Sequence, residues 1–210
     1  RMERHTIDDD VYIRSMSSRG HLGGLSGATS EVVDLLDAAG FDRILVETVG
    51  VGQSELSVME VADTVLVVLT PESGDAVQTM KAGLIEIADV FVVNKADRPG
   101  ADRLATELER SIDLVDIGEK EWRTPVLTAC ALEGDGVNEA AAKAELHRAW
   151  TTKDGAESWQ GRRADGRVRR TLDLVAERAR GRAEAALGEG TDVRTGAETP
   201  HEAAERLERA

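Results

Sequence analysis

Four consecutive residues, Asn94 to Asp97, are of types that can recognise a nucleotide base. They read Asn-Lys-Ala-Asp and directly follow an apolar run, 90–93. A carboxylate at Asp97 can accept two hydrogen bonds from the N1–H and N2–H2 edge of guanine. Adenine has no matching pair of donors, so such a contact discriminates against ATP. Asn94 and Lys95 would brace the purine and its loop. The pattern predicts a guanine-binding loop, and a strand end followed by a polar turn is the alternative.

A second motif combines a carboxylate with glycines. An apolar run, 44–46, ends in Glu47, and the sequence Thr-Val-Gly-Val-Gly-Gln follows it. Ligands of open α/β sheets bind at the carboxyl ends of strands, so Glu47 is predicted to face such a crevice. A carboxylate there can hold the water shell of Mg²⁺. Gly50 lacks a Cβ and can bring its amide close to a terminal phosphate. A glycine-rich turn with a capping glutamate is the alternative.

A third stretch, Thr128-Ala129-Cys130-Ala131, stands where GTPases place the loop whose backbone amide contacts guanine O6. Threonine replaces the usual serine at its first position. We interpret Cys130 as a small, partly buried apolar residue rather than a nucleophile, because no histidine accompanies it locally.

The elements that must position these residues follow from continuous apolar runs. Four runs are predicted strands: 44–47, 64–70, 90–94 and 126–129. Runs without alternation are typical of parallel strands that are covered on both faces. Helical patterns over 30–39, 75–88 and 102–113 separate them. Strands that alternate with helices predict an α/β fold with a doubly wound, mostly parallel sheet.

The C-terminal part has a different character, and we expect a domain over 1–150 and a helical arm over 151–210. The polar stretch 151–166 could be a helical connection or a linker. Val168, Leu172, Val175 and Ala179 then form a narrow apolar stripe on a charged helix. Such a helix either packs on its own domain or forms a dimerisation arm. A loop over 188–200 and a short helix over 201–209 are expected to follow.

Composition excludes several classes of protein. The chain has 210 residues and a formal net charge of −14, which argues against binding to nucleic acid and to anionic membranes. Its single cysteine, Cys130, precludes an internal disulfide and fits a reducing cytosol. There is no apolar run of about 20 residues and no recognisable secretory signal. We therefore expect a cytoplasmic protein.

Taken together, these motifs resemble the methylmalonyl-CoA mutase-associated GTPases. These are G-protein metallochaperones, also known by an older label as arginine/ornithine transport kinases. The resemblance extends at least over 1–136, and more weakly to the end of the chain. The run 47–55 is its most specific part. The segments that carry the resemblance are Arg4-His5 to Asp8, Tyr12 to Met16, Arg19-Gly20 to Gly23-Gly24, Ala38 to Glu55 and Asn94 to Asp97.

The resemblance implies a phosphate-loop NTPase fold, Mg²⁺ as cofactor and GTP as substrate. It implies loading and protection of a B12-dependent methylmalonyl-CoA mutase or a related acyl-CoA mutase, and a homodimer. The loop 71–75 would be a switch that faces this partner, although Ala82 replaces a residue that is commonly basic in the family. The implied sites are catalytic Glu47, Gly50 and Gln53; nucleotide-binding Asn94, Lys95, Asp97, Thr128 and Ala129; metal-binding Asp8 and Glu47; and partner-facing Asp75, Gln78 and Lys81.

One family motif is missing from these 210 residues, because no G-x-x-x-x-G-K-[ST] sequence occurs. The family carries it upstream of the position matching Arg1. We therefore expect a sheet without its first strand and phosphate loop. Two alternatives to a GTPase follow: an inactive fragment that keeps only its guanine-reading and partner-binding surfaces, or, by the older label, a transport-system kinase.

Overall fold

The fold is taken from a computed structural model of the chain, which describes residues 2, 5, 7–16, 28–48, 58–59, 61–72, 85–114, 122–153, 155–187 and 199–208. The chain forms two units, Arg1–Arg163 and Ala164–Ala210. Each unit is described by itself.

The first unit is built on a three-stranded parallel sheet in the order β1-β2-β3. Its strands are β1 (Leu66–Leu69), β2 (Val90–Asn94) and β3 (Val126–Ala129). The central β2 begins with four fully buried residues, Val-Phe-Val-Val, which explains its unbroken apolar run. β2 and β3 have the predicted bounds, and β1 lies within its predicted run.

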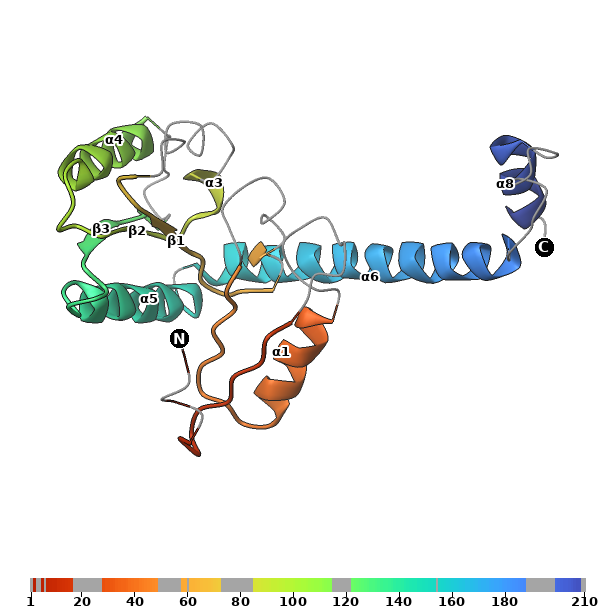
Figure 1. Ribbon diagram of the computed structural model, residues 1–210, viewed down its shortest axis with the longest axis horizontal. Coiled ribbons are helices and arrows are strands. Elements are labelled where there is room, and N and C mark those ends of the chain that lie inside the picture. Colours follow the sequence, from red (N-terminus) through yellow and green to blue (C-terminus); the bar gives the residue numbers. More distant parts are fainter. Residues whose placement is uncertain are drawn as a thin grey trace. The chain divides into compact units, whose positions relative to one another are not determined.

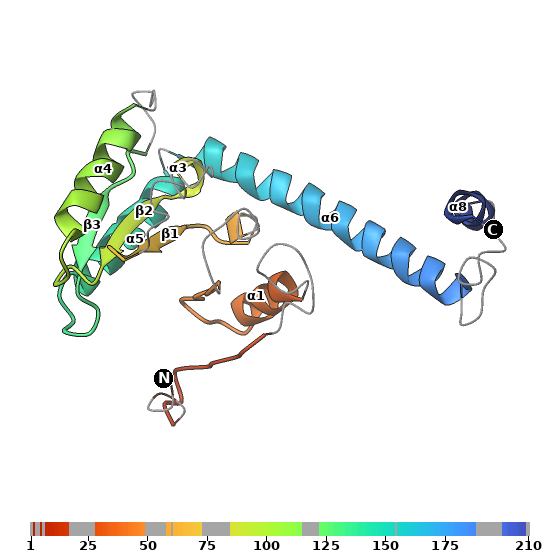
Figure 2. The same cartoon turned by 45° about the horizontal axis from the view of Figure 1, so that its top comes forward.

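Two helices cover opposite faces of this sheet, as Figures 1 and 2 show: α4 (Ala101–Asp113) and α5 (Val137–Thr151). α4 buries Ala101, Leu104, Leu108 and Ile112, which share one face at helical spacing. They pack on Phe91 and Val93. On the other face, Val90 and Val92 form a smaller core with Leu127, Ala129 and Ala140. This arrangement confirms the predicted α/β class.

The predicted strand over 44–47 is wrong, because these residues form no strand in the structure. A strand exists only through hydrogen bonds to a neighbour, and among the described residues β1 pairs with β2 alone. Leu45 is 95% exposed as a result. The segment is held instead by its flanks: Arg43 donates to both carboxylate oxygens of Glu145 on α5, at 2.7 and 3.0 Å, and Phe41 contacts the ring of Tyr12.

In the described ranges, two α-helices precede the central strand. α1 (Thr29–Ala38) agrees with the predicted helix over 30–39, and it ends before Gly40, whose φ of +88° suits glycine. Only the end of the predicted helix over 75–88 lies in the described part of the chain, as α3 (Ile85–Ile87).

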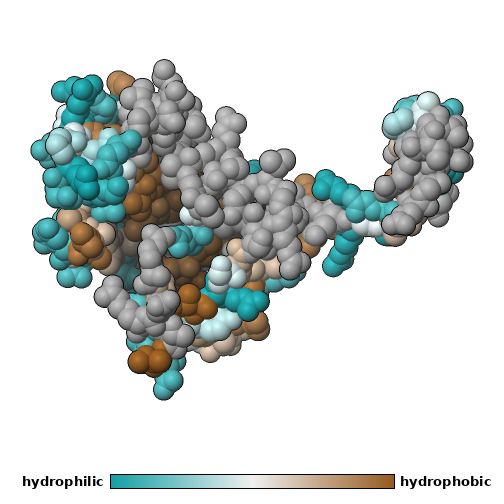
Figure 3. Space-filling model, in the orientation of Figure 1, coloured by the Kyte–Doolittle hydropathy of each residue, from teal (hydrophilic) through white to brown (hydrophobic). Residues whose placement is uncertain are grey.

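The sheet leaves apolar side chains of its first strand uncovered. Leu66 and Val68 are 39% and 49% exposed. They pair in register with Val90 and Val92, so they belong to the face that α5 covers further along the sheet. Hydrophobic atoms are visible on the surface of the first unit in Figure 3.

A buried histidine organises the amino ends of the strands. His147 on α5 is fully buried, and its Nδ1 lies 2.8 Å from Thr64 Oγ1. Its Nε2 lies 3.2 Å from Asp89 Oδ1 without the alignment of a hydrogen bond. Trp122 and Trp150 pack around the imidazole, with ring centroids 5.0 and 5.7 Å away.

Asp89 connects this cluster to the sheet and to the following helix. Its Oδ2 accepts the Val65 amide at 2.8 Å, and its carbonyl accepts the Trp122 indole N–H at 2.7 Å. Arg162 donates to its Oδ1 at 3.3 Å. Arg162 lies in the first turns of α6 (Ala156–Leu187), where Trp159 also donates to Asp63 at 3.1 Å. The first turns of α6 are therefore held by hydrogen bonds within the first unit.

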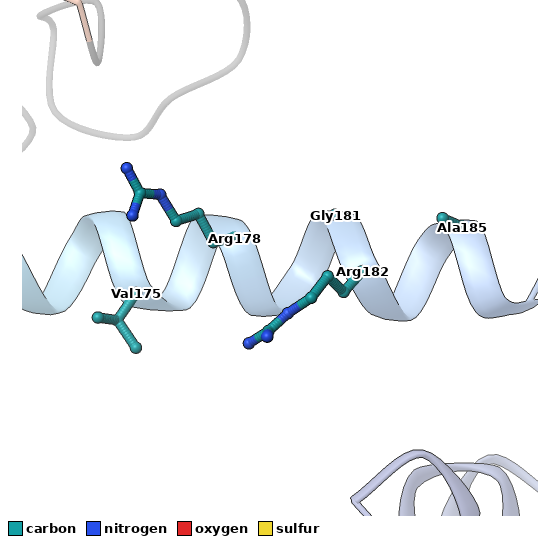
Figure 4. A pocket seen from close by; sticks show the side chains of 5 residues that line it. All are labelled: Val175, Arg178, Gly181, Arg182 and Ala185. Atoms are coloured by element: carbon teal, nitrogen blue, oxygen red, sulfur yellow. The ribbon is translucent and has the colours of Figure 1, made fainter. Parts of the chain in front are cut away.

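The second unit contains the rest of α6 and the short helix α8 (Pro200–Glu208). The apolar stripe of α6 is solvent-exposed at Val168, Leu172 and Val175. A shallow hollow runs further along the same helix, as Figure 4 shows, and is lined by Val175, Arg178, Gly181, Arg182 and Ala185. None of the helices formed by the described residues is both long and apolar enough to cross a bilayer.

The start of α8 follows from its sequence. Thr199 and Glu202 exchange hydrogen bonds as a capping box, and Pro200 occupies the first helical position.

Candidate guanine-binding site

The register of the sheet brings two predicted site segments together. Asn94 ends β2 directly beside Ala129, the last residue of β3. Beyond the strands, the Ala96 amide donates to the Ala129 carbonyl at 3.0 Å, and the Ala131 amide donates to Asn94 Oδ1 at 3.1 Å. The loop after β2 and the loop after β3 are thus joined at the carboxyl end of the sheet, where ligands of α/β folds bind.

Lys95 has an unusual backbone conformation. Its φ is +58°, and among the described residues it alone has a positive φ without being glycine. Such a conformation costs about 1–2 kcal/mol for a residue with a Cβ. The turn is held by the Arg98 amide, which donates to the Lys95 carbonyl at 2.9 Å. Strain of this kind is typical of loops that are shaped for binding.

Asp97 is the predicted base-reading residue, and its side chain is 50% exposed. The Cys130 thiol donates to Oδ1 at 3.4 Å. The Arg98 guanidinium lies 3.6 Å from Oδ2. The carboxylate is therefore held from two sides while half of its surface remains open to a ligand.

A carboxylate after β1 joins the same group. Glu72 accepts a hydrogen bond from Lys95 Nζ at 2.7 Å and lies 3.4 Å from Arg98 Nη1. The hydrogen bond from Lys95 lowers the pKa of Glu72 below its usual value, and burial opposes this shift only in part. These are exposed ion pairs, so each adds little stability. Their effect is positional, because they connect Glu72 to the loop 94–98 after β2, which we call the base loop.

Glycines permit the close approach of chain segments at this edge. Gly136 precedes α5 with a φ of +73°, and a Cβ there would clash with the Thr128 carbonyl oxygen and lie 2.9 Å from Ala129 Cα. Gly100 precedes α4 with a φ of +95°, and a Cβ there would lie 3.8 Å from Pro71 Cβ, an ordinary contact distance. Both positions require a residue that tolerates the left-handed conformation.

The structure brings only some of the predicted site residues together. Asn94, Lys95 and Asp97 come together, while Thr128 and Ala129 lie in β3 and the loop that meets Asn94 begins at Cys130. Sequence reasoning included Ala131 in the stretch 128–131 expected near guanine, although it named only Thr128 and Ala129 as binding residues, and it did not assign Glu72 or Arg98 to this group. The position of Ala131 just beyond the fourth apolar run, 126–129, was the signal for it. The remaining predicted residues that fall outside the described part of the chain are Gly50, Gln53, Asp75, Gln78 and Lys81.

The two carboxylates predicted to bind Mg²⁺ lie in exposed segments. Asp8 accepts the Asp10 amide at 3.1 Å in a surface turn, and Glu47 lies in the extended stretch after Arg43. In the described ranges, no group of three His, Cys, Asp or Glu side chains could hold a metal ion. The metal roles of Asp8 and Glu47 stay predictions.

A parallel sheet that presents an Asn-Lys-Ala-Asp loop beside the loop of the next strand is the arrangement that the sequence predicted for a guanine-binding region. The family described as methylmalonyl-CoA mutase-associated GTPase MeaB matches residues 1–187. The chain belongs to this family.

Curated relatives agree with this assignment. A protein of Mycobacterium tuberculosis named "Probable GTPase" is 44% identical over 180 residues, which cover 84% of this chain and 53% of that protein. The mouse protein named methylmalonic aciduria type A homolog is 37% identical over 142 residues, 66% of this chain and 34% of that protein. The chain spans about half the length of several curated relatives that it matches.

A solved structure titled as a LAO/AO transport system kinase resembles the fold with a TM-score of 0.61 and 24% identity. The match covers 88% of this chain and 63% of that one. At this identity the likeness supports the α/β fold and nothing finer.

Proposed function

We propose that this chain supplies the guanine-recognition part of a GTP-hydrolysing protein. The observation that carries the proposal is the half-exposed Asp97 carboxylate, held beside the junction of Asn94 and Ala131. Its two oxygens match the N1–H and N2–H2 donors of guanine, and in this proposal the loop that follows β3 would supply the amide for O6. Guanine thus finds complementary partners, whereas adenine would leave the carboxylate without donors.

Hydrolysis would proceed by in-line attack of water on the terminal phosphorus, with catalysis mainly through positioning and charge stabilisation. We propose that Glu47, Gly50 and Gln53 serve this step and that Mg²⁺ accompanies the triphosphate. Contacts to the phosphates would come from a phosphate loop, a motif that these 210 residues do not contain.

We further propose that the protein acts on a B12-dependent methylmalonyl-CoA mutase and forms a homodimer through α6. The family description names this mutase, and the mouse relative is named for methylmalonic aciduria. The exposed stripe at Val168, Leu172 and Val175 supports the dimer, because a stripe covered by its own unit would be buried.

The test of guanine recognition uses a hybrid protein. In it, the chain is fused at Arg1 to the residues of the Mycobacterium tuberculosis relative that precede its match, which the family resemblance implies carry the phosphate loop. Asp97→Asn should weaken GTP binding by about 2–4 kcal/mol, about 30- to 1000-fold in Kd, because a charge-assisted bidentate contact is lost. Competition calorimetry against ATP measures the change.

A gain of binding makes the test sharper. Xanthine carries a carbonyl where guanine has its 2-amino group, so the amide of Asp97→Asn can donate to it while still accepting from N1–H. We expect the variant to prefer XTP to GTP. Unaltered preference for GTP over both XTP and ATP would refute the assignment of Asp97. Failure of the unmodified hybrid to bind GTP would refute the proposed function.

A further inference from the structure

We propose that Cys130 is a positioning residue for base recognition, because its thiol holds the Asp97 carboxylate in the orientation that reads guanine. The inference rests on the proposed function. It gives the single cysteine of the chain a role that is neither catalytic nor metal-binding.

The thiol approaches the base-reading group directly. Cys130 Sγ lies 3.4 Å from Asp97 Oδ1, a normal length for a hydrogen bond from sulfur. The Asp97 side chain is otherwise half exposed, and its Oδ2 lies 3.6 Å from the exposed Arg98 guanidinium. An exposed ion pair of that length restrains a side chain weakly. The buried thiol is therefore the firmer of the two restraints.

Cys130 is itself well fixed. Its amide donates to the Asp135 carbonyl at 2.9 Å, and its own carbonyl accepts the amides of Glu133 and Gly134 at 3.0 and 2.9 Å. Its side chain is buried beneath the loop, with the residue 8% exposed. A donor anchored in this way can set the direction of the carboxylate that it touches.

The surroundings keep the thiol protonated, as a donor must be. A hydrogen bond with the Glu133 backbone acts to lower the pKa of Cys130, but burial and the neighbouring Asp97 carboxylate outweigh it and raise that pKa above its usual value. A buried, protonated thiol is a poor nucleophile. These properties fit positioning rather than covalent chemistry.

Loss of the thiol would release one side of Asp97. A carboxylate must present both oxygens to bind N1–H and N2–H2 together, so a tilt toward Arg98 would sacrifice one of the two bonds. The effect should appear in discrimination between bases rather than in binding of the phosphates. Hypoxanthine, which lacks only the 2-amino group of guanine, is the matched probe.

The experiment measures Kd for GDP and IDP by calorimetry in the hybrid protein and three variants. Cys130→Ala removes the donor, and Cys130→Ser restores one. Thr151→Ala removes a small buried polar group at the opposite end of α5 and serves as the control. We expect Cys130→Ala to reduce the preference for GDP over IDP about three- to tenfold, the scale of one ordinary hydrogen bond. Cys130→Ser and Thr151→Ala should keep the original preference.

Each outcome bears on a different claim. An unchanged preference in Cys130→Ala overturns the positioning role. An equal loss in Thr151→Ala, or a loss that serine does not prevent, also overturns it, because the effect would then be one of general packing. A hybrid protein that binds GDP no better than IDP and ADP would instead refute the proposed function, before any variant is compared.

Discussion

Gly136→Ala should destabilise the edge of the sheet that carries the base loop. The added Cβ meets two separate obstacles. The backbone φ of +73° is unfavourable for alanine by about 1–2 kcal/mol. The new methyl group would also clash with the Thr128 carbonyl oxygen and lie 2.9 Å from Ala129 Cα, and overpacking of this kind costs about 1–3 kcal/mol. The sum is a loss of about 2–5 kcal/mol in the free energy of unfolding.

Gly134 offers a matched control in the same loop. Its φ is +90°, but a Cβ there would meet nothing within 4 Å. Gly134→Ala should therefore lower the free energy of unfolding only by the backbone conformational cost, about 1–2 kcal/mol. Thermal unfolding of the hybrid protein, followed by circular dichroism, should show a fall in Tm of about 4–20 °C for Gly136→Ala and about 2–8 °C for Gly134→Ala. Equal losses of Tm in the two variants would show that the close approach of Gly136 to β3 does not contribute to stability.

Three further outcomes follow from the remaining site and surface residues. Glu47→Ala in the hybrid protein should lower kcat at least about 10²-fold, the scale for a positioned charge, and near-normal turnover at saturating Mg²⁺ would remove this role from Glu47. Leu172→Asp should convert a dimer into a monomer, as measured by light scattering, while the affinity for GDP is retained. A protein that is already a monomer before mutation would contradict the proposal that α6 forms a dimer. The chain of 210 residues, expressed alone, should be poorly soluble. Because it has no phosphate loop, it should also release phosphate from GTP no faster than background. Mg²⁺-dependent turnover with micromolar GTP affinity would overturn this expectation.

Local sequence predicted the strands whose partners lie within the described sheet. The bounds of β2 and β3 were correct because each is a short apolar run that ends where the chain must turn. The run 44–47 has the same character and forms no strand. Apolar residues show that a segment favours an extended form, but pairing also requires a neighbouring strand, and composition does not contain that information.

The polar stretch 151–166 proved helical for most of its length, although it contains three glycines. Each glycine within a helix costs about 1 kcal/mol relative to alanine. Contacts that are distant in the sequence compensate, since Trp159 and Arg163 both bind Asp63, at 3.1 and 3.0 Å. No local pattern could reveal them.

In the site, too, the sequence predicted the local motif but not the contacts between distant residues. Asn94 and Asp97 were identified from their spacing, because a base-reading loop is a local motif. The bonds from Lys95 to Glu72 and from Cys130 to Asp97 join residues that are far apart in the sequence. Such contacts depend on the order of strands in the sheet, so they became visible only in the structure.

The aromatic cluster around His147 has a practical consequence for spectroscopy. The chain has three tryptophans. Trp122 and Trp150 contact the buried imidazole, and Trp159 is bonded to Asp63, next to the threonine that the same imidazole contacts. Intrinsic fluorescence of this chain therefore reports on the amino ends of the strands and on the start of α6. The base loop lies at the carboxyl ends and contributes no fluorophore of its own there. A change in emission on addition of nucleotide would thus be a signal carried through the length of the sheet.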